Sequence, residues 1–160
     1  MRAVAVLRAG TWDGAAADTV LIDHDHRHRR RIRLTTLGGA TLLLDLEQAT
    51  HLRDGDALVL DDGSRMRVAA RPEPVLDIHA HDPAALLRIA WHLGNRHLPV
   101  QLLPGRLRIR ADHVIAEMVA GLGGHAEALE APFDPEAGAY EGGGGHAHHH
   151  HDHDHDDHEH

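Results

Sequence analysis

The sequence predicts an α+β protein made of two small domains and a C-terminal tail, because three stretches of the chain differ in pattern. Residues 1–72 contain short strand-like segments between turns, and residues 73–131 alternate strand and helix patterns. Residues 132–160 are rich in Gly, His and Asp. A chain of 160 residues can hold one ordinary domain or two small ones, and the change of pattern near residue 72 favours two.

Residues 1–72 are expected to form a small all-β domain. Their apolar runs are short and partly alternate with polar residues, as in strands with one face in water. Turn sequences such as Gly38-Gly39 and Asp61-Asp62-Gly63-Ser64 separate these runs. The expected strands are Ala3–Leu7, Thr19–Ile22, Arg31–Thr35, Thr41–Leu46, Ala57–Leu60 and Arg65–Ala69.

A histidine-rich segment, His24-Asp25-His26-Arg27-His28, follows the second of these strands. It has the residue types of a metal site, but it continues into Arg29-Arg30-Arg31, and fixed positive charge opposes the binding of a divalent cation. We therefore interpret the segment as a solvated, charged connection between strands. His51 has no evident partner in the sequence, so no role is predicted for it.

The segment Arg71-Pro72-Glu73-Pro74 is the expected linker, because two prolines in four residues suit neither a strand interior nor a helix. The domain that follows, residues 73–131, has the order β-α-β-β-α-β. This is the ferredoxin-like arrangement, in which both helices cover one face of a four-stranded antiparallel sheet. The expected strands are Val75–Ile78, Val100–Leu103, Leu107–Arg110 and Ala126–Glu130, and the expected helices are Asp82–Leu93 and Asp112–Leu122.

The end of the first helix presents a histidine. Asp82 is the expected N-cap, and Gly94 can take the left-handed conformation that closes such a helix. Pro99 prevents the helix from resuming. The intervening residues, Asn95-Arg96-His97, therefore form a short polar loop in which His97 is positioned by the fold yet reachable.

The second helix begins with another well-placed histidine, His113, directly after its expected N-cap, Asp112. Taken alone, His113 has the position of an ordinary exposed residue at a helix start. No role is predicted for the remaining histidines of this domain, which are His79, His81, His92 and His125.

Residues 132–160 are expected to be a flexible tail that binds metal ions. The glycine run 142–145 lies before a segment with nine of the nineteen histidines, interleaved with carboxylates. Imidazole suits Ni²⁺, Cu²⁺ and Zn²⁺, and the segment is not specific among these three ions. A purification tag is the other interpretation, but alternating His and Asp favours a native segment. The candidate ligands are His146, His148, His149, His150, His151, His153, His155, His158 and His160.

Composition excludes several other classes of protein. Without cysteine the chain has no disulfides and no thiolate metal sites. The start of the chain has the pattern of a strand rather than a signal peptide, and no apolar run approaches the roughly 20 residues of a bilayer span, so we expect a cytoplasmic protein. A net charge of −9 does not suggest a nucleic-acid surface. No His-Glu-x-x-His motif is present for metal-dependent hydrolysis, so we expect no enzyme.

The two domains, the tail and two short motifs together resemble the family of urease accessory protein UreE, the nickel metallochaperone of urease maturation. The motifs are Gly94-Asn95-Arg96-His97 after the first helix and Asp112-His113-Val114 at the start of the second. The resemblance implies a homodimer in which His97 of each subunit meets its twin and holds one Ni²⁺. It also implies that His113 and the tail histidines are further ligands. Some members of the family have a further histidine two residues before the position of His113, where this chain has Ala111.

The same resemblance implies a peptide-binding N-terminal domain and, as partners, the urease apoprotein complex and the accessory GTPase UreG. We therefore expect a protein that delivers Ni²⁺ for assembly of the urease active site. The alternative hypothesis is a nickel or zinc storage protein, in which the histidine-rich tail alone is the functional part.

Overall fold

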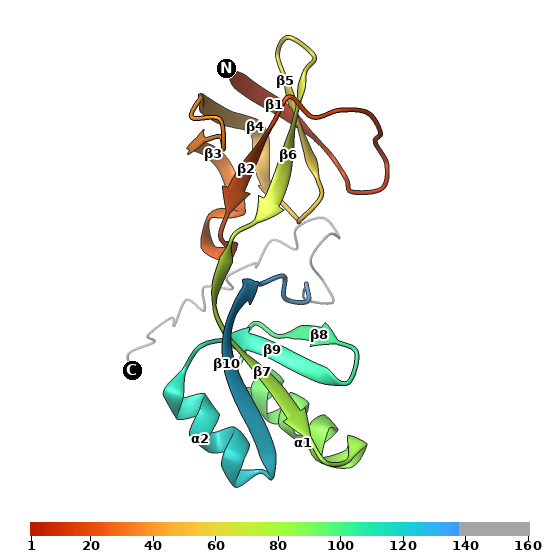
Figure 1. Cartoon of the computed structure of the whole chain (residues 1–160), viewed down its shortest axis with the longest axis vertical. Helices are drawn as coiled ribbons and strands as arrows, with labels where there is room; N and C mark the ends of the chain where they lie inside the picture. Colours follow the sequence, from red (N-terminus) through yellow and green to blue (C-terminus); the bar gives the residue numbers. More distant parts are fainter. Residues whose placement is uncertain (138–160) are drawn as a thin grey trace, which may run out of the picture.

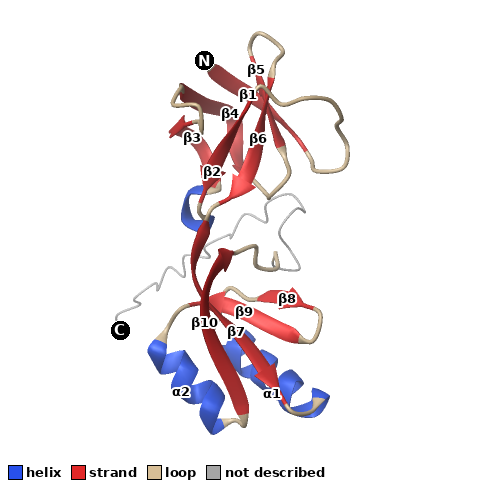
Figure 2. Ribbon diagram, in the orientation of Figure 1, coloured by secondary structure: helices blue, strands red, loops and turns tan. Residues whose placement is uncertain are grey.

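The computed structural model describes residues 1–137 as two β-sheets, one above the other along the long axis of the molecule (Figure 1). The upper sheet belongs to the N-terminal part of the chain, and the lower sheet carries both α-helices (Figure 2). Mixed α+β content in two domains is therefore confirmed. Neither helix within residues 1–137 has the length and apolar character needed to cross a bilayer.

The N-terminal sheet has six strands in the order β2-β6-β5-β1-β4-β3. Each strand contains one of the segments expected from the sequence, extended by up to five residues at an end. The strands are β1 (Arg2–Leu7), β2 (Asp18–Ile22), β3 (His28–Thr35), β4 (Thr41–His51), β5 (Ala57–Leu60) and β6 (Arg65–Ala70). Their inward residues form one apolar core, which includes Val20, Leu42, Leu44, Leu58 and Val68.

The C-terminal sheet has four strands in the order β10-β7-β9-β8, and every neighbouring pair is antiparallel. Its elements are β7 (Pro72–Ala80), α1 (Pro83–Asn95), β8 (Gln101–Leu103), β9 (Arg106–Arg110), α2 (His113–Gly121) and β10 (Gly124–Pro132). Ile89 of α1 and Val119 of α2 pack with Ile78 of β7 in a single core, so both helices lie on the same face of the sheet.

The expectation that Pro72 and Pro74 do not suit a strand is wrong, because both lie in β7 and pair with β10 opposite Pro132 and Glu130. The carbonyl of Pro74 accepts a hydrogen bond from the amide of Ala111, on the side away from β10. In an antiparallel strand the N–H and C=O of one residue point the same way, so the missing proline N–H removes no bond between β7 and β10.

Residues 132–137, which were expected to belong to the flexible tail, are packed against both sheets. The side chain of Phe133 is fully buried beside Val75. Arg27, expected to be solvated, is also fully buried, and its guanidinium donates to the carbonyls of Phe133 and Ile22. Asp134 forms an ion pair with Arg53 at 3.1 Å. The sequence did not predict this packing, because Phe133 is a single aromatic residue between prolines and belongs to no periodic apolar pattern.

Gly124, at the start of β10, is a position where a side chain does not fit. An added Cβ would lie 2.6 Å from Ile89 Cδ1, 2.8 Å from Val119 Cγ1 and 3.2 Å from the carbonyl oxygen of His79. We expect Gly124→Ala to lower the free energy of unfolding by about 1–3 kcal/mol, as overpacked cores do. Gly121→Ala is the matched control, because its Cβ would meet nothing within 4 Å and alanine favours helix. Urea unfolding of both variants checks this, and equal stabilities would contradict it.

Candidate metal centre

His97 stands at the end of α1 in a left-handed backbone conformation. Its φ is +57°, and no other non-glycine residue among those described has a positive φ. The amide of His97 donates to the carbonyl of Gly94 at 3.0 Å, and the amide of Leu98 donates to that of Leu93 at 3.3 Å. These two bonds make up a Schellman motif with Arg96 as C-cap.

Gly94 was expected to take the left-handed conformation, and this prediction is wrong, because α1 continues through Asn95 and the reversal occurs at His97. Glycine is the usual residue at such a position because it lacks a Cβ. A histidine there carries roughly 1 kcal/mol or more of backbone strain. Leu98 packs against the core that contains Leu93, and this contact holds the strained backbone of His97 in place. The side chain of His97 itself is exposed.

His113 is the first residue of α2, and its side chain is also exposed. The predicted cap is confirmed, because the Asp112 carboxylate accepts from the amides of Val114 at 2.9 Å and Ile115 at 3.2 Å. A cavity of about 270 Å³ connects the two motifs, since Leu98 and Pro99, which follow His97, line it together with Ala111 and Asp112.

The two motifs thus lie on neighbouring segments, yet residues 1–137 of one chain do not provide a complete site. Within residues 1–137, no three His, Asp or Glu side chains are placed around a common point that could hold a metal ion. The predicted ligands of the tail, His146 to His160, lie outside the described residues. A single exposed imidazole holds a divalent ion weakly, so His97 requires ligands from elsewhere.

A second group of histidines faces His97 from the N-terminal sheet. His24, His28 and His51 line a cavity of about 550 Å³ together with His97. The rings of His24 and His28 have their centroids 5.9 Å and 5.8 Å from that of His51. Sequence reasoning missed this group because it depends on contacts between distant segments: His28 and His51 are partners in the pairing of β3 with β4, and His97 comes from the C-terminal domain.

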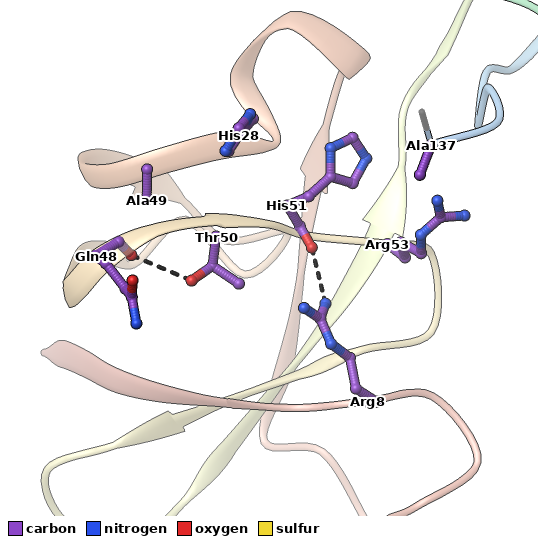
Figure 3. A pocket seen from close by; sticks show the side chains of 8 residues that line it. All are labelled: Arg8, His28, Gln48, Ala49, Thr50, His51, Arg53 and Ala137. Carbon is purple, nitrogen blue, oxygen red and sulfur yellow. Dashed lines mark hydrogen bonds between the residues drawn. The ribbon is translucent and has the colours of Figure 1, made fainter. Parts of the chain in front are cut away.

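Arginines surround these histidines. The His24 ring contacts the guanidinium of Arg110, which also pairs with Asp25 at 2.6 Å. In the adjacent pocket, Arg8 and Arg53 lie beside His51, and Arg8 donates to the His51 carbonyl at 2.7 Å (Figure 3). This much fixed positive charge disfavours a divalent cation. We therefore infer that His24, His28 and His51 line the cavity beside His97 without binding the metal ion.

The environment also affects proton binding by two of these rings. Burial lowers the pKa of His24 below its ordinary value of 6.5, and the charges of Arg110 and Arg27 lower it further. Burial likewise lowers the pKa of His51, with Arg53 and Arg27 adding to the effect. Both imidazoles are therefore predominantly neutral at pH 7.

These two pKa values predict how stability depends on pH. Below about pH 6.5 the unfolded chain binds protons at His24 and His51 that the folded chain does not, so the free energy of unfolding falls as the pH decreases. We expect urea unfolding of the metal-free chain to show lower stability at about pH 5.5 than at about pH 7.5. The double variant His24→Asn/His51→Asn should show a smaller difference between these pH values, and an undiminished difference would contradict the assignment.

Comparisons with known proteins agree with the motifs. The family model "UreE urease accessory protein, N-terminal domain" matches residues 2–71, and "UreE urease accessory protein, C-terminal domain" matches residues 73–160. Similar proteins named urease accessory protein UreE come from Rhodopseudomonas palustris strain HaA2 (62% identical over 129 residues) and Bradyrhizobium sp. strain ORS 278 (58% over 140 residues). A third, from Rhodobacter capsulatus, is 47% identical over 142 residues.

The aligned regions cover 81%, 88% and 89% of this chain, respectively. This chain spans 60% of the length of the Rhodopseudomonas protein, 67% of the Bradyrhizobium protein and 88% of the Rhodobacter protein.

Proposed function

Since this chain belongs to the UreE family of urease accessory proteins, we propose that it is a nickel metallochaperone that delivers Ni²⁺ for assembly of the urease active site. In this proposal Ni²⁺ is cargo, and the chain carries out no catalysis. The domains are residues 1–72, the peptide-binding-like part, residues 73–131, the ferredoxin-like part that binds metal and dimerises, and a tail at residues 132–160. Within this proposed tail the structure describes residues 132–137, where Phe133 packs beside Val75 and the amide of Asp134 donates to the Gln101 side chain.

The observation that carries the proposal is the conformation of His97. A strained non-glycine residue in an exposed loop, where glycine would be more stable, points to a function for its side chain. The Schellman hydrogen bonds fix the backbone of His97, so the position of its Cα–Cβ bond is defined. An accessible imidazole on a fixed backbone is suited to taking up and releasing a borderline cation such as Ni²⁺.

A homodimer would complete the site. Contact across a two-fold axis presents every ligand twice, so two copies of His97 could share one ion. Support for such contact comes from exposed apolar side chains on the C-terminal domain. Leu87 and Trp91, one turn apart on α1, are 72% and 64% exposed, and Val114 beside His113 is 55% exposed. Apolar side chains this exposed, on α1 and beside His113, favour burial against another copy.

The remaining ligands of the proposal are His113 and the nine tail histidines. Since Ala111 stands where the family resemblance implies a histidine in some members, His113 has fewer neighbours to share an ion with, and tail imidazoles would complete its coordination. A tail tethered near the site raises the local concentration of ligands there. Zn²⁺ and Cu²⁺ would compete with Ni²⁺, because nitrogen ligands follow the Irving–Williams order.

The partners in this proposal are the urease apoprotein complex and the accessory GTPase UreG, which would receive nickel from the dimer. A storage role for the tail alone finds no support in the comparisons, because the similar proteins are named as urease accessory proteins.

The proposal is tested by urease activation at limiting nickel. Nickel-loaded chain is mixed with urease apoprotein and the other accessory proteins, and urease activity is compared with that obtained from the same amount of free Ni²⁺. We expect higher activity with the loaded chain, and a loss of this advantage with His97→Ala. His92→Ala is the matched control, because it removes an imidazole from α1, the helix that precedes His97. Activity equal to that with free nickel would overturn the proposal.

A further inference from the structure

Two histidines at the far end of the C-terminal sheet, away from the N-terminal domain, lie within ligand distance of each other. His81 follows the end of β7, and His125 is the second residue of β10 (Figure 1). Their Nε2 atoms are 3.3 Å apart, and their rings are nearly perpendicular, with centroids 5.1 Å apart. Both side chains are exposed, so solvent and ions reach them.

This separation matches the spacing that a metal ion requires. Imidazole nitrogens bind Zn²⁺ at about 2.0–2.1 Å, so two such ligands of a tetrahedral ion are roughly 3.3 Å apart. For comparison, the rings around His51 have centroids at 5.8 and 5.9 Å, farther apart than those of His81 and His125. The pair therefore needs little rearrangement to bind an ion.

The backbone on both sides of the pair is well fixed. Gly124, which precedes His125, fits closely against Ile89 and Val119. Asp82, which follows His81, caps α1 by accepting from the amide of Ala85 at 2.7 Å. Because rigid elements carry both rings, the metal-free chain already holds them near the geometry of the bound state.

The surroundings of the pair also suit a cation. Among the described residues, neither ring makes a hydrogen bond with an arginine, in contrast to His24. His79 is paired with His125 in the β7–β10 ladder, so its side chain is on the same face of the sheet. Glu127, two residues after His125 on that face, is exposed.

We propose that His81 and His125 form a two-imidazole binding site for a borderline divalent cation, Ni²⁺, Zn²⁺ or Cu²⁺, within a single chain. Its other coordination positions are open to water, to His79 or to an incoming ligand. An ion held by only two protein ligands exchanges readily, so the site binds metal ions transiently at the protein surface. It is independent of His97 and of dimer contact, and it stands even if the proposed delivery role fails.

The test uses the full-length chain with His97 and the nine tail histidines changed to Asn. Zn²⁺ is added, and the ring resonances of the remaining histidines are followed by NMR. We expect those of His81 and His125 to shift together and saturate at one Zn²⁺ per chain, with a rise in Tm, because the ion binds only the folded state. Light scattering should show the same mass with and without Zn²⁺.

His125→Asn and His81→Asn should each remove the shift, and His92→Asn is the control that should keep it. Thermal unfolding without metal verifies that each variant is folded. The proposal is overturned if the ring resonances of His81 and His125 do not shift with Zn²⁺. The pair would then be only a hydrogen bond between two imidazoles. It is also overturned if Zn²⁺ binding survives in both single variants.

Discussion

Replacing His97 with glycine is expected to make the folded chain more stable while removing the nickel that the proposed dimer would hold. Glycine adopts the left-handed conformation of this position without the strain that histidine carries, so the free energy of unfolding should rise by about 0.5–1 kcal/mol. The imidazole is lost at the same time. We expect the Ni²⁺ that the proposed dimer would share to be lost completely, while the proposed tail histidines would still bind ions.

His97→Ala is the matched control, because alanine removes the imidazole but keeps the strained Cβ. It should lose the same nickel with a stability within about 0.5 kcal/mol of the original chain. Urea unfolding of metal-free protein gives the stabilities, and equilibrium dialysis with Ni²⁺ gives the bound metal. A glycine variant less stable than the alanine variant would contradict the role of strain, and nickel shared between subunits in either variant would contradict the role of His97.

The second large effect is expected at Asp77, which lies on the sheet face opposite the helices and is almost fully buried. Its carboxylate accepts from Arg108 Nε at 2.7 Å and Nη2 at 3.1 Å, and from Arg106 Nε at 3.0 Å. The Arg108 guanidinium holds the pKa of Asp77 below its usual value. Arg108 also donates to the carbonyl of Pro132 at 3.0 Å, so this group links β9, β7 and β10.

Asp77→Ala leaves a nearly buried guanidinium without its partner, and breaking such a pair typically costs about 3–5 kcal/mol. We expect a loss at the lower end of this range, about 3 kcal/mol, because Arg106 is more exposed and can reach water. Asp45→Ala is the matched control: Asp45 pairs with the exposed Arg2 at 3.0 Å and should cost at most about 1 kcal/mol. Urea unfolding measures the loss of stability in both variants. Equal losses for Asp77→Ala and Asp45→Ala would show that burial of the ion pair does not determine the cost of breaking it.

Local patterns in the sequence predict the elements of this chain well. The capping aspartates, Asp82 and Asp112, act where the helices were expected to start, and each expected strand segment overlaps an observed strand. These features depend on residues close together in the chain, which the sequence displays directly. They also place His97 and His113 at helix ends.

What the sequence could not predict depends on contacts between distant segments. The burial of Arg27 requires the carbonyl of Phe133, more than a hundred positions away. The pairing of His81 with His125 requires the register between β7 and β10. The left-handed residue was misplaced at Gly94 because residue type alone favours glycine, whereas the structure places His97 there. The errors therefore concern long-range packing and a strained residue at the candidate site.

The most direct test of the account is nickel titration of the full-length chain with the nine tail histidines changed to Asn, with the mass of the oligomer followed by light scattering. The account predicts one tightly bound Ni²⁺ for every two chains, lost when His97→Ala is added. If all tight binding disappears with the tail histidines alone, His97 is only a structured loop residue and the tail is the functional part of the chain.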